Sequence, residues 1–147
     1  MNATKSKSEY LHETSNDSLY VVAEKWESDM QFYTDEIRFF NELIKDHFLW
    51  IINNDHLTKV EELNTRLSKL SVELQTVYAK IKKHLEHLSE LDTNEFAYDE
   101  QKFREEHQDL ESKVVDFNKS YRKFKKDLFE TVKDGINKEK LQYLQKD

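Results

Sequence analysis

Apolar side chains recur at steps of three and four residues along three long segments of the chain. In an α-helix this spacing places the side chains on one face, where they can pack against a neighbouring helix. Two short polar stretches without the pattern, Asn53-Asn54-Asp55 and Asp92-Thr93-Asn94, separate the segments. We therefore predict helices over residues 18–52, 57–92 and 96–134 and a short separate last turn over residues 138–144.

The middle segment repeats its apolar positions every seven residues, in alternating steps of three and four. This heptad is typical of helices that pack as left-handed coiled coils and cross at about 20°. The heptad positions are Val60, Leu63, Leu67, Leu70, Leu74, Val77, Ile81, His84, Leu88 and Leu91.

Short breaks between long helices make each helix run antiparallel to the one before it. The predicted fold class is therefore all-α, with an elongated antiparallel three-helix bundle and coiled-coil packing. We predict a single domain over residues 18–147, preceded by a flexible polar segment over residues 1–17.

Composition supports this fold class and removes others. The 147 residues include one glycine and no proline, whereas β-rich and α/β folds need both residues for their many turns. The lack of cysteine excludes disulfides, thiolate metal sites and cysteine nucleophiles. Charged residues make up 36% of the chain, as is typical of long solvated helices.

Hydropathy and charge bear on location and partners. The longest uninterrupted apolar run, residues 48–52, is far shorter than the roughly 20 residues that span a bilayer. Residues 1–17 lack the apolar core of a signal peptide, so we expect a cytoplasmic protein with no membrane partner. The net charge of −7 argues against a nucleic-acid partner, although residues 113–147 hold ten Lys or Arg against six Asp or Glu.

One stretch of the first segment resembles a known group of proteins. It reads Trp26-x-x-x-Met30-x-Phe32-Tyr33-x-Asp35-Glu36-Ile37-x-Phe39-Phe40-x-x-Leu43. This order of a tryptophan, an aromatic pair, an acidic pair and further apolar residues resembles an uncharacterised family of small, cysteine-free bacterial helical coiled-coil proteins. The resemblance implies a three-helix coiled coil and carries over no activity and no catalytic residue.

Motifs for catalysis are missing from the sequence. The single glycine, Gly135, cannot build a phosphate-binding loop, and no EF-hand loop is present. Neither HExxH nor ExxH occurs in the predicted helices, which weakens a ferritin-like di-iron interpretation. We therefore expect no catalytic and no cofactor-binding residues. The carboxylate pairs are expected on solvated outer faces of the helices: Glu61-Glu62, Asp99-Glu100 and Glu105-Glu106.

Three polar residues on predicted core faces could share one layer of the bundle: Asp29, His84 and His107. With short turns between antiparallel helices, His84 is expected opposite Trp26, one turn from Asp29, and opposite residues 102–108 of the third segment.

Such a layer has two interpretations. Two histidines and a carboxylate can bind a transition metal with open positions, and His87 could join them as an outer ligand. The structural alternatives are a buried hydrogen-bonded layer that fixes the register of the helices, or a histidine that reaches solvent. We favour the structural alternatives and expect no cofactor.

The first segment carries more large apolar residues than a three-helix core requires, whereas the other two have narrow stripes with few additions, such as Phe129. These extra residues either cover the flank of the bundle, receive the N-terminal segment, or form a contact between two copies of the chain. We predict the homodimer, with aromatic anchors. The predicted interface residues are Phe32, Phe39, Leu43 and Trp50.

A group of basic residues shares one face of the third segment, at i, i+3, i+4 and i+7 spacing: Lys119, Arg122, Lys123 and Lys126. We favour a solvated face that is partly paired with acidic surface over a docking site for an acidic partner.

These patterns predict a non-enzymatic helical-bundle scaffold or protein-interaction module, which forms a homodimer and takes protein partners. The alternative function is a metal-binding bundle that uses the layer of two histidines and one carboxylate.

Overall fold

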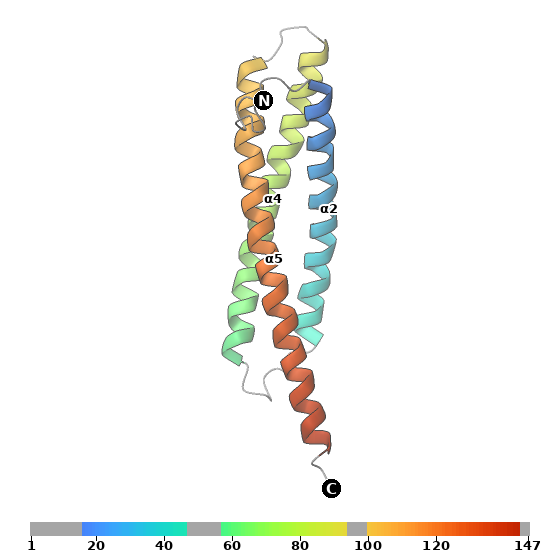
Figure 1. Cartoon of the computed structure of the whole chain (residues 1–147), viewed down its shortest axis with the longest axis vertical. Coiled ribbons are helices and arrows are strands. Elements are labelled where there is room, and N and C mark those ends of the chain that lie inside the picture. Colours follow the sequence, from blue (N-terminus) through green and yellow to red (C-terminus); the bar gives the residue numbers. More distant parts are fainter. Residues whose placement is uncertain (1–15, 47–56, 94–99, 145–147) are drawn as a thin grey trace, which may run out of the picture. The chain divides into compact units, whose positions relative to one another are not determined.

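The computed structural model describes three stretches of the chain, and each is a single α-helix (Figure 1): α2 (Asn16–Asp46), α4 (Leu57–Thr93) and α5 (Glu100–Leu144). These stretches contain no strand, so the predicted all-α class with three long helices is confirmed.

Among the described residues, the largest difference from the predicted helix ends lies at the end of α5. The predicted helix end at residue 134 and the separate last turn over 138–144 are wrong, because α5 continues through Gly135 to Leu144. A glycine inside a helix costs only about 1 kcal/mol relative to alanine, so a single one does not have to end it. The predicted continuation of the first helix to residue 52 lies outside the described residues.

The heptad positions of α4 are buried as predicted, from Val60 to Leu88, while the side chain of Leu91 is not described. In α2 the steps of three and four residues from Leu19 also predict Val22 in the core, and this prediction is wrong. Val22 is exposed and Ala23 is fully buried in its place. Ala23 lies four residues after Leu19, so it stays on the same helix face, and its small side chain lets a neighbouring helix approach closely.

The helices pack in two compact units, and each helix contributes one segment to each unit. Unit 1 contains Met1–Phe32 and Leu74–Asp116. Unit 2 contains Tyr33–Glu73 and Phe117–Asp147. Within each unit the described residues come from all three helices, as expected for three-helix packing.

Unit 1 has an apolar layer followed by an aromatic and polar layer. Leu19, Leu88 and Phe103 form one buried cluster. Two turns further along α2, the centre of the Trp26 ring lies 4.6 Å from the centre of the His107 ring. Residue numbers therefore rise together on α2 and α5, so these two helix segments run parallel, with α4 antiparallel to both.

Unit 2 has an aromatic core between α2 and α5. The ring of Tyr33 lies 5.8 Å from that of Phe117, and the ring of Phe40 lies 6.1 Å from that of Phe124. In this unit, too, α2 and α5 run parallel. The Tyr121 hydroxyl donates a hydrogen bond of 2.5 Å to Glu36, which fixes the register of the two helices through a partly buried polar contact.

No helix in the described part of the chain combines the length and the apolar character that a membrane span needs.

Candidate functional site

Unit 1 contains a hydrogen-bonded layer of histidines between α4 and α5. His84 and His107 are each 1% exposed, and Nε2 of His84 lies 2.8 Å from Nδ1 of His107. Nδ1 of His84 lies 2.7 Å from Oε1 of Glu106, and Nδ1 of His87 lies 2.9 Å from the same oxygen. The predicted meeting of His84 with His107 is therefore confirmed. We call these four residues the histidine layer.

The direction of the hydrogen bonds follows from the carboxylate. An ionised Glu106 can only accept, so Nδ1–H of His84 donates to it and Nε2 of a neutral His84 is an acceptor. His107 must then donate its Nδ1–H to Nε2 of His84. Both ring nitrogens of His84 are thus engaged, which leaves this imidazole no nitrogen for a substrate or a metal.

Aromatic rings enclose the two buried histidines. The His84 ring stacks on Phe103, with 4.3 Å between ring centres and 4° between ring planes. The His107 ring packs against Trp26 on α2. This apolar enclosure disfavours a positive charge on His84, because a charged imidazole is poorly solvated there.

Burial lowers the pKa of His84, and this effect outweighs the hydrogen bond and the charge of Glu106, which act in the opposite direction. Burial raises the pKa of Glu106, but the hydrogen bonds from His84 and His87 outweigh it and hold this pKa below its usual value. At neutral pH the layer therefore contains a neutral His84 beside an ionised carboxylate.

Asp29 does not join the layer, so the predicted set of Asp29, His84 and His107 is not assembled. Its carboxylate pairs with Lys25, one turn earlier on α2, with Oδ2 and Nζ 3.4 Å apart. The large Trp26 ring is the α2 side chain that packs on His107. Across the residues that the structure describes, no group of three or more His, Asp or Glu side chains could hold a metal ion.

Glu106 is the residue of this layer that the sequence interpretation missed, since it placed Glu105 and Glu106 together on an outer face. The Glu106 side chain is 31% exposed and turns towards α4. A signal was available, because Glu106 precedes a core position, and a buried histidine such as His84 needs a polar partner at the edge of the core.

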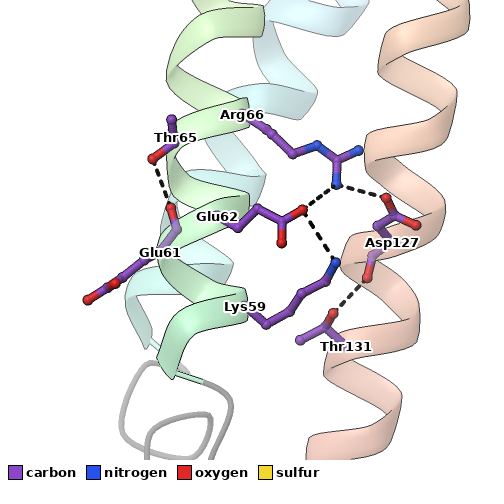
Figure 2. Close-up of polar contacts among 7 residues, drawn as sticks. All are labelled: Lys59, Glu61, Glu62, Thr65, Arg66, Asp127 and Thr131. Atoms are coloured by element: carbon purple, nitrogen blue, oxygen red, sulfur yellow. Dashed lines mark hydrogen bonds and ion pairs between the residues drawn. The ribbon is translucent and has the colours of Figure 1, made fainter.

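A second polar region lies in unit 2, where α4 faces α5 (Figure 2). Nη1 of Arg66 lies 2.7 Å from Oδ2 of Asp127 and 3.7 Å from Oε1 of Glu62. The Glu62 carboxylate also forms an ion pair with Lys59. The hydrogen bond from Arg66 lowers the pKa of Asp127. Glu62, Arg66 and Asp127 border a groove of about 430 Å³. The charged groups of these three residues pair with one another, which is typical of a structural contact between helices.

A third feature of interest is an exposed aromatic surface in unit 2. Phe39 on α2 is 55% exposed and Phe129 on α5 is 50% exposed. Both rings pack on the buried Phe40 ring, at 5.9 Å and 5.8 Å between centres. The sequence interpretation treated Phe129 as an addition to the core stripe, and it missed this exposure because the angle of a helix about its axis is set by its neighbours.

The other residues of the predicted interface have different surroundings. Phe32 belongs to unit 1 and is 59% exposed, and Leu43 in unit 2 is partly buried. Trp50 lies outside the described residues.

The predicted basic face is solvent-exposed at all four positions: Lys119, Arg122, Lys123 and Lys126. Lys123 also borders the groove beside Asp127 and contributes to the lowered pKa of that carboxyl. Lys123 is thus the residue of the basic face that lies within electrostatic reach of Asp127, and the choice between a solvated face and a docking site stays a prediction.

Comparison with protein-family models, curated proteins and solved structures finds no match to this chain. The resemblance over Trp26–Leu43 therefore stays an expectation.

Proposed function

We propose that this chain is a non-enzymatic helical interaction module that associates with a second copy of itself through the exposed aromatic face of α2 in unit 2. The observation that carries the proposal is Phe39, more than half exposed beside a second exposed ring, Phe129. Fully burying a phenylalanine side chain contributes on the order of 1.5–3 kcal/mol, so a partner that covers these rings gains affinity.

The polar clusters support a non-enzymatic role. Both nitrogens of His84 are engaged within the histidine layer, and Arg66 is engaged with Asp127 and Glu62. A catalytic centre needs groups that are held ready for a substrate, whereas these groups are used to join helices. The lack of cysteine is compatible with the reducing cytoplasm that we propose as its location.

A second copy is the simplest partner for such a face. A two-fold contact needs one self-complementary patch, and any chain that exposes the patch supplies its own partner. Aromatic residues are also the side chains that most often act as anchors at protein interfaces.

Sedimentation velocity of the full chain at tens of micromolar tests the proposal. We expect a dimer for the wild type and a dissociation constant at least about tenfold higher for Phe39→Ala, because the anchor ring is removed without a change in charge. Val72→Ala is the matched control, since Val72 is an exposed apolar residue on α4 of the same unit. It should leave the dimer intact.

Circular dichroism must show the same helix content for both variants. A wild type that stays monomeric over this range would overturn the proposal, and so would a Phe39→Ala variant that dimerises like the wild type.

A further inference from the structure

The exposed ring of Phe129 lies in a purely basic stripe on α5. At 100° of rotation per residue, the stripe extends to about 80° on one side of Phe129 and about 60° on the other. Among residues 117–134 no carboxylate falls within it, since Asp127, Glu130 and Asp134 lie further round the helix. Its cations are Lys119, Arg122, Lys125, Lys126 and Lys133. We call this surface the basic stripe.

The exposed ring of Phe39 lies in an acidic stripe on α2. Within about 60° of Phe39 on either side, residues 33–46 hold no lysine or arginine, since Arg38 and Lys45 lie further round the helix. The remaining apolar residue of the stripe is Leu43. Its carboxylates are Asp35, Glu36, Glu42 and Asp46. We call this surface the acidic stripe.

The two stripes border each other within unit 2. Nζ of Lys125 lies 2.9 Å from Oε1 of Glu36, which joins the inner edge of one stripe to that of the other. We call the line along which the two stripes meet the seam. Phe39 and Phe129 both pack on the Phe40 ring, which lies beneath the seam. The result is one surface with an acidic half, a basic half and an aromatic ring in each.

We infer that the acidic stripe of α2 in each copy of the chain packs against the basic stripe of α5 in a second copy. The dimer therefore pairs α2 of each copy with α5 of the other. The inference rests on the proposed function and names its partner surface. A two-fold axis parallel to the helices along the seam produces both contacts at once. A pairing of α2 with α2 would instead place two acidic stripes together, and like charges across an interface weaken association.

The helix register specifies which residues meet. A residue of α2 lies level with one about 84 to 89 places later on α5, as the contacts of Tyr33 with Phe117 and of Phe40 with Phe129 show. In a parallel dimer, Asp35 therefore faces the partner's Arg122, and Asp46 faces the partner's Lys133. Phe39 and the partner's Phe129 pack between these two pairs.

Charge reversal in the full chain tests this pairing. The α2 variant carries Asp35→Lys, Glu42→Lys and Asp46→Lys, and the α5 variant carries Arg122→Glu, Lys126→Glu and Lys133→Glu. We expect the dissociation constant of each variant to be at least about tenfold higher than that of the wild type, because each variant places like charges on the two facing stripes. Both sets combined in one chain should restore the dimer, since opposite charges face each other again and the net charge returns to −7.

A control separates the stripe from net charge. Lys69→Glu, Lys83→Glu and Lys102→Glu together change the net charge as much as the α5 variant does, at exposed positions outside both stripes. This control should dimerise like the wild type. Circular dichroism of every variant should match the wild type.

Salt gives a second readout with a definite sign. Raising the salt concentration should weaken the wild-type dimer, because screening reduces attraction between opposite charges, whereas it would strengthen an α2–α2 dimer. A wild-type dimer that is unchanged by the α5 reversal, or that tightens with salt, would overturn the α2–α5 pairing and leave the proposed function standing. A monomeric wild type would overturn both.

Discussion

At the scale of the residue, unit 1 places an ionised carboxylate at the edge of its core to satisfy a buried imidazole. Glu106 accepts hydrogen bonds from His84 and His87, and His84 in turn accepts one from His107. An unsatisfied buried donor costs about 1–3 kcal/mol. Each hydrogen bond in this series therefore removes the cost of burying the polar group that it satisfies. The layer holds α4 and α5 in one register.

Removing one buried histidine should cost more than its own hydrogen bonds suggest. We expect His84→Leu to lower the free energy of unfolding by about 1–3 kcal/mol, because it leaves Nδ1–H of His107 buried without its acceptor. The double variant with His107→Leu should cost less than the sum of the two single variants, since neither partner is then left unsatisfied. Urea unfolding of the three variants measures this coupling. Strictly additive costs would contradict it.

The same layer should make stability fall in acid. The pKa of His84 lies below 6.5 in the fold, so below pH 6.5 the unfolded chain binds more protons and stability decreases with falling pH. The lowered pKa of Glu106 acts in the same direction below pH 4.5. His87 and His107 are the other titratable groups of the layer. We expect the urea concentration at the unfolding midpoint of the wild type to decrease as the pH is lowered from about 7.5 to about 5.5, the range around the ordinary histidine pKa.

Fluorescence of Trp26, which packs on His107, reports this change when Trp50→Phe removes the second tryptophan of the chain. The fall should be smaller in His84→Leu. An equal fall in both proteins would assign the acid sensitivity to groups outside the layer.

At the scale of the element, each helix has a continuous apolar face and few residues that could interrupt it. The heptad of α4 stays buried over its described length from Val60 to Leu88, and α5 continues through its single glycine. Propensity is a weak determinant in such a helix, because neighbouring turns and packing outweigh one unfavourable residue.

Gly135 is a position where α5 can be stabilised. A Cβ atom added there would meet no atom within 4 Å, so Gly135→Ala should add about 0.5–1 kcal/mol by reducing the freedom of the unfolded chain. Ala79→Gly, at an exposed position inside α4, is the matched opposite change and should cost a similar amount. Thermal unfolding followed by circular dichroism measures both. A loss of stability in Gly135→Ala would show that the glycine serves a purpose other than continuing the helix.

At the scale of the whole molecule, the two units differ in the residues that they bury and in those that they expose. Unit 1 buries the histidine layer, and unit 2 exposes two phenylalanines in stripes of opposite charge. The chain has a net charge of −7, but the basic residues of α5 gather around Phe129. The experiments on Phe39 and on the two stripes therefore test association, while those on the histidine layer test stability.

Several properties followed from the sequence alone. The three helices and the buried heptad of α4 were predictable, because helical periodicity is a local property of neighbouring residues. The absence of proline and the single glycine excluded turn-rich folds. Antiparallel order also placed His84 opposite His107, since short breaks fix the register of long helices to within about one turn.

The tertiary structure decided which side chains meet at the edges of the helices. Glu106 reaches His84, whereas Asp29 stays with Lys25 and Trp26 takes the position on His107. Phe129 faces outward beside Phe39. The position of a flanking residue depends on a small rotation of its helix, and that rotation is set by the packing of all neighbouring side chains. Periodicity therefore assigns a face to a residue, and only the packed helices select its partner.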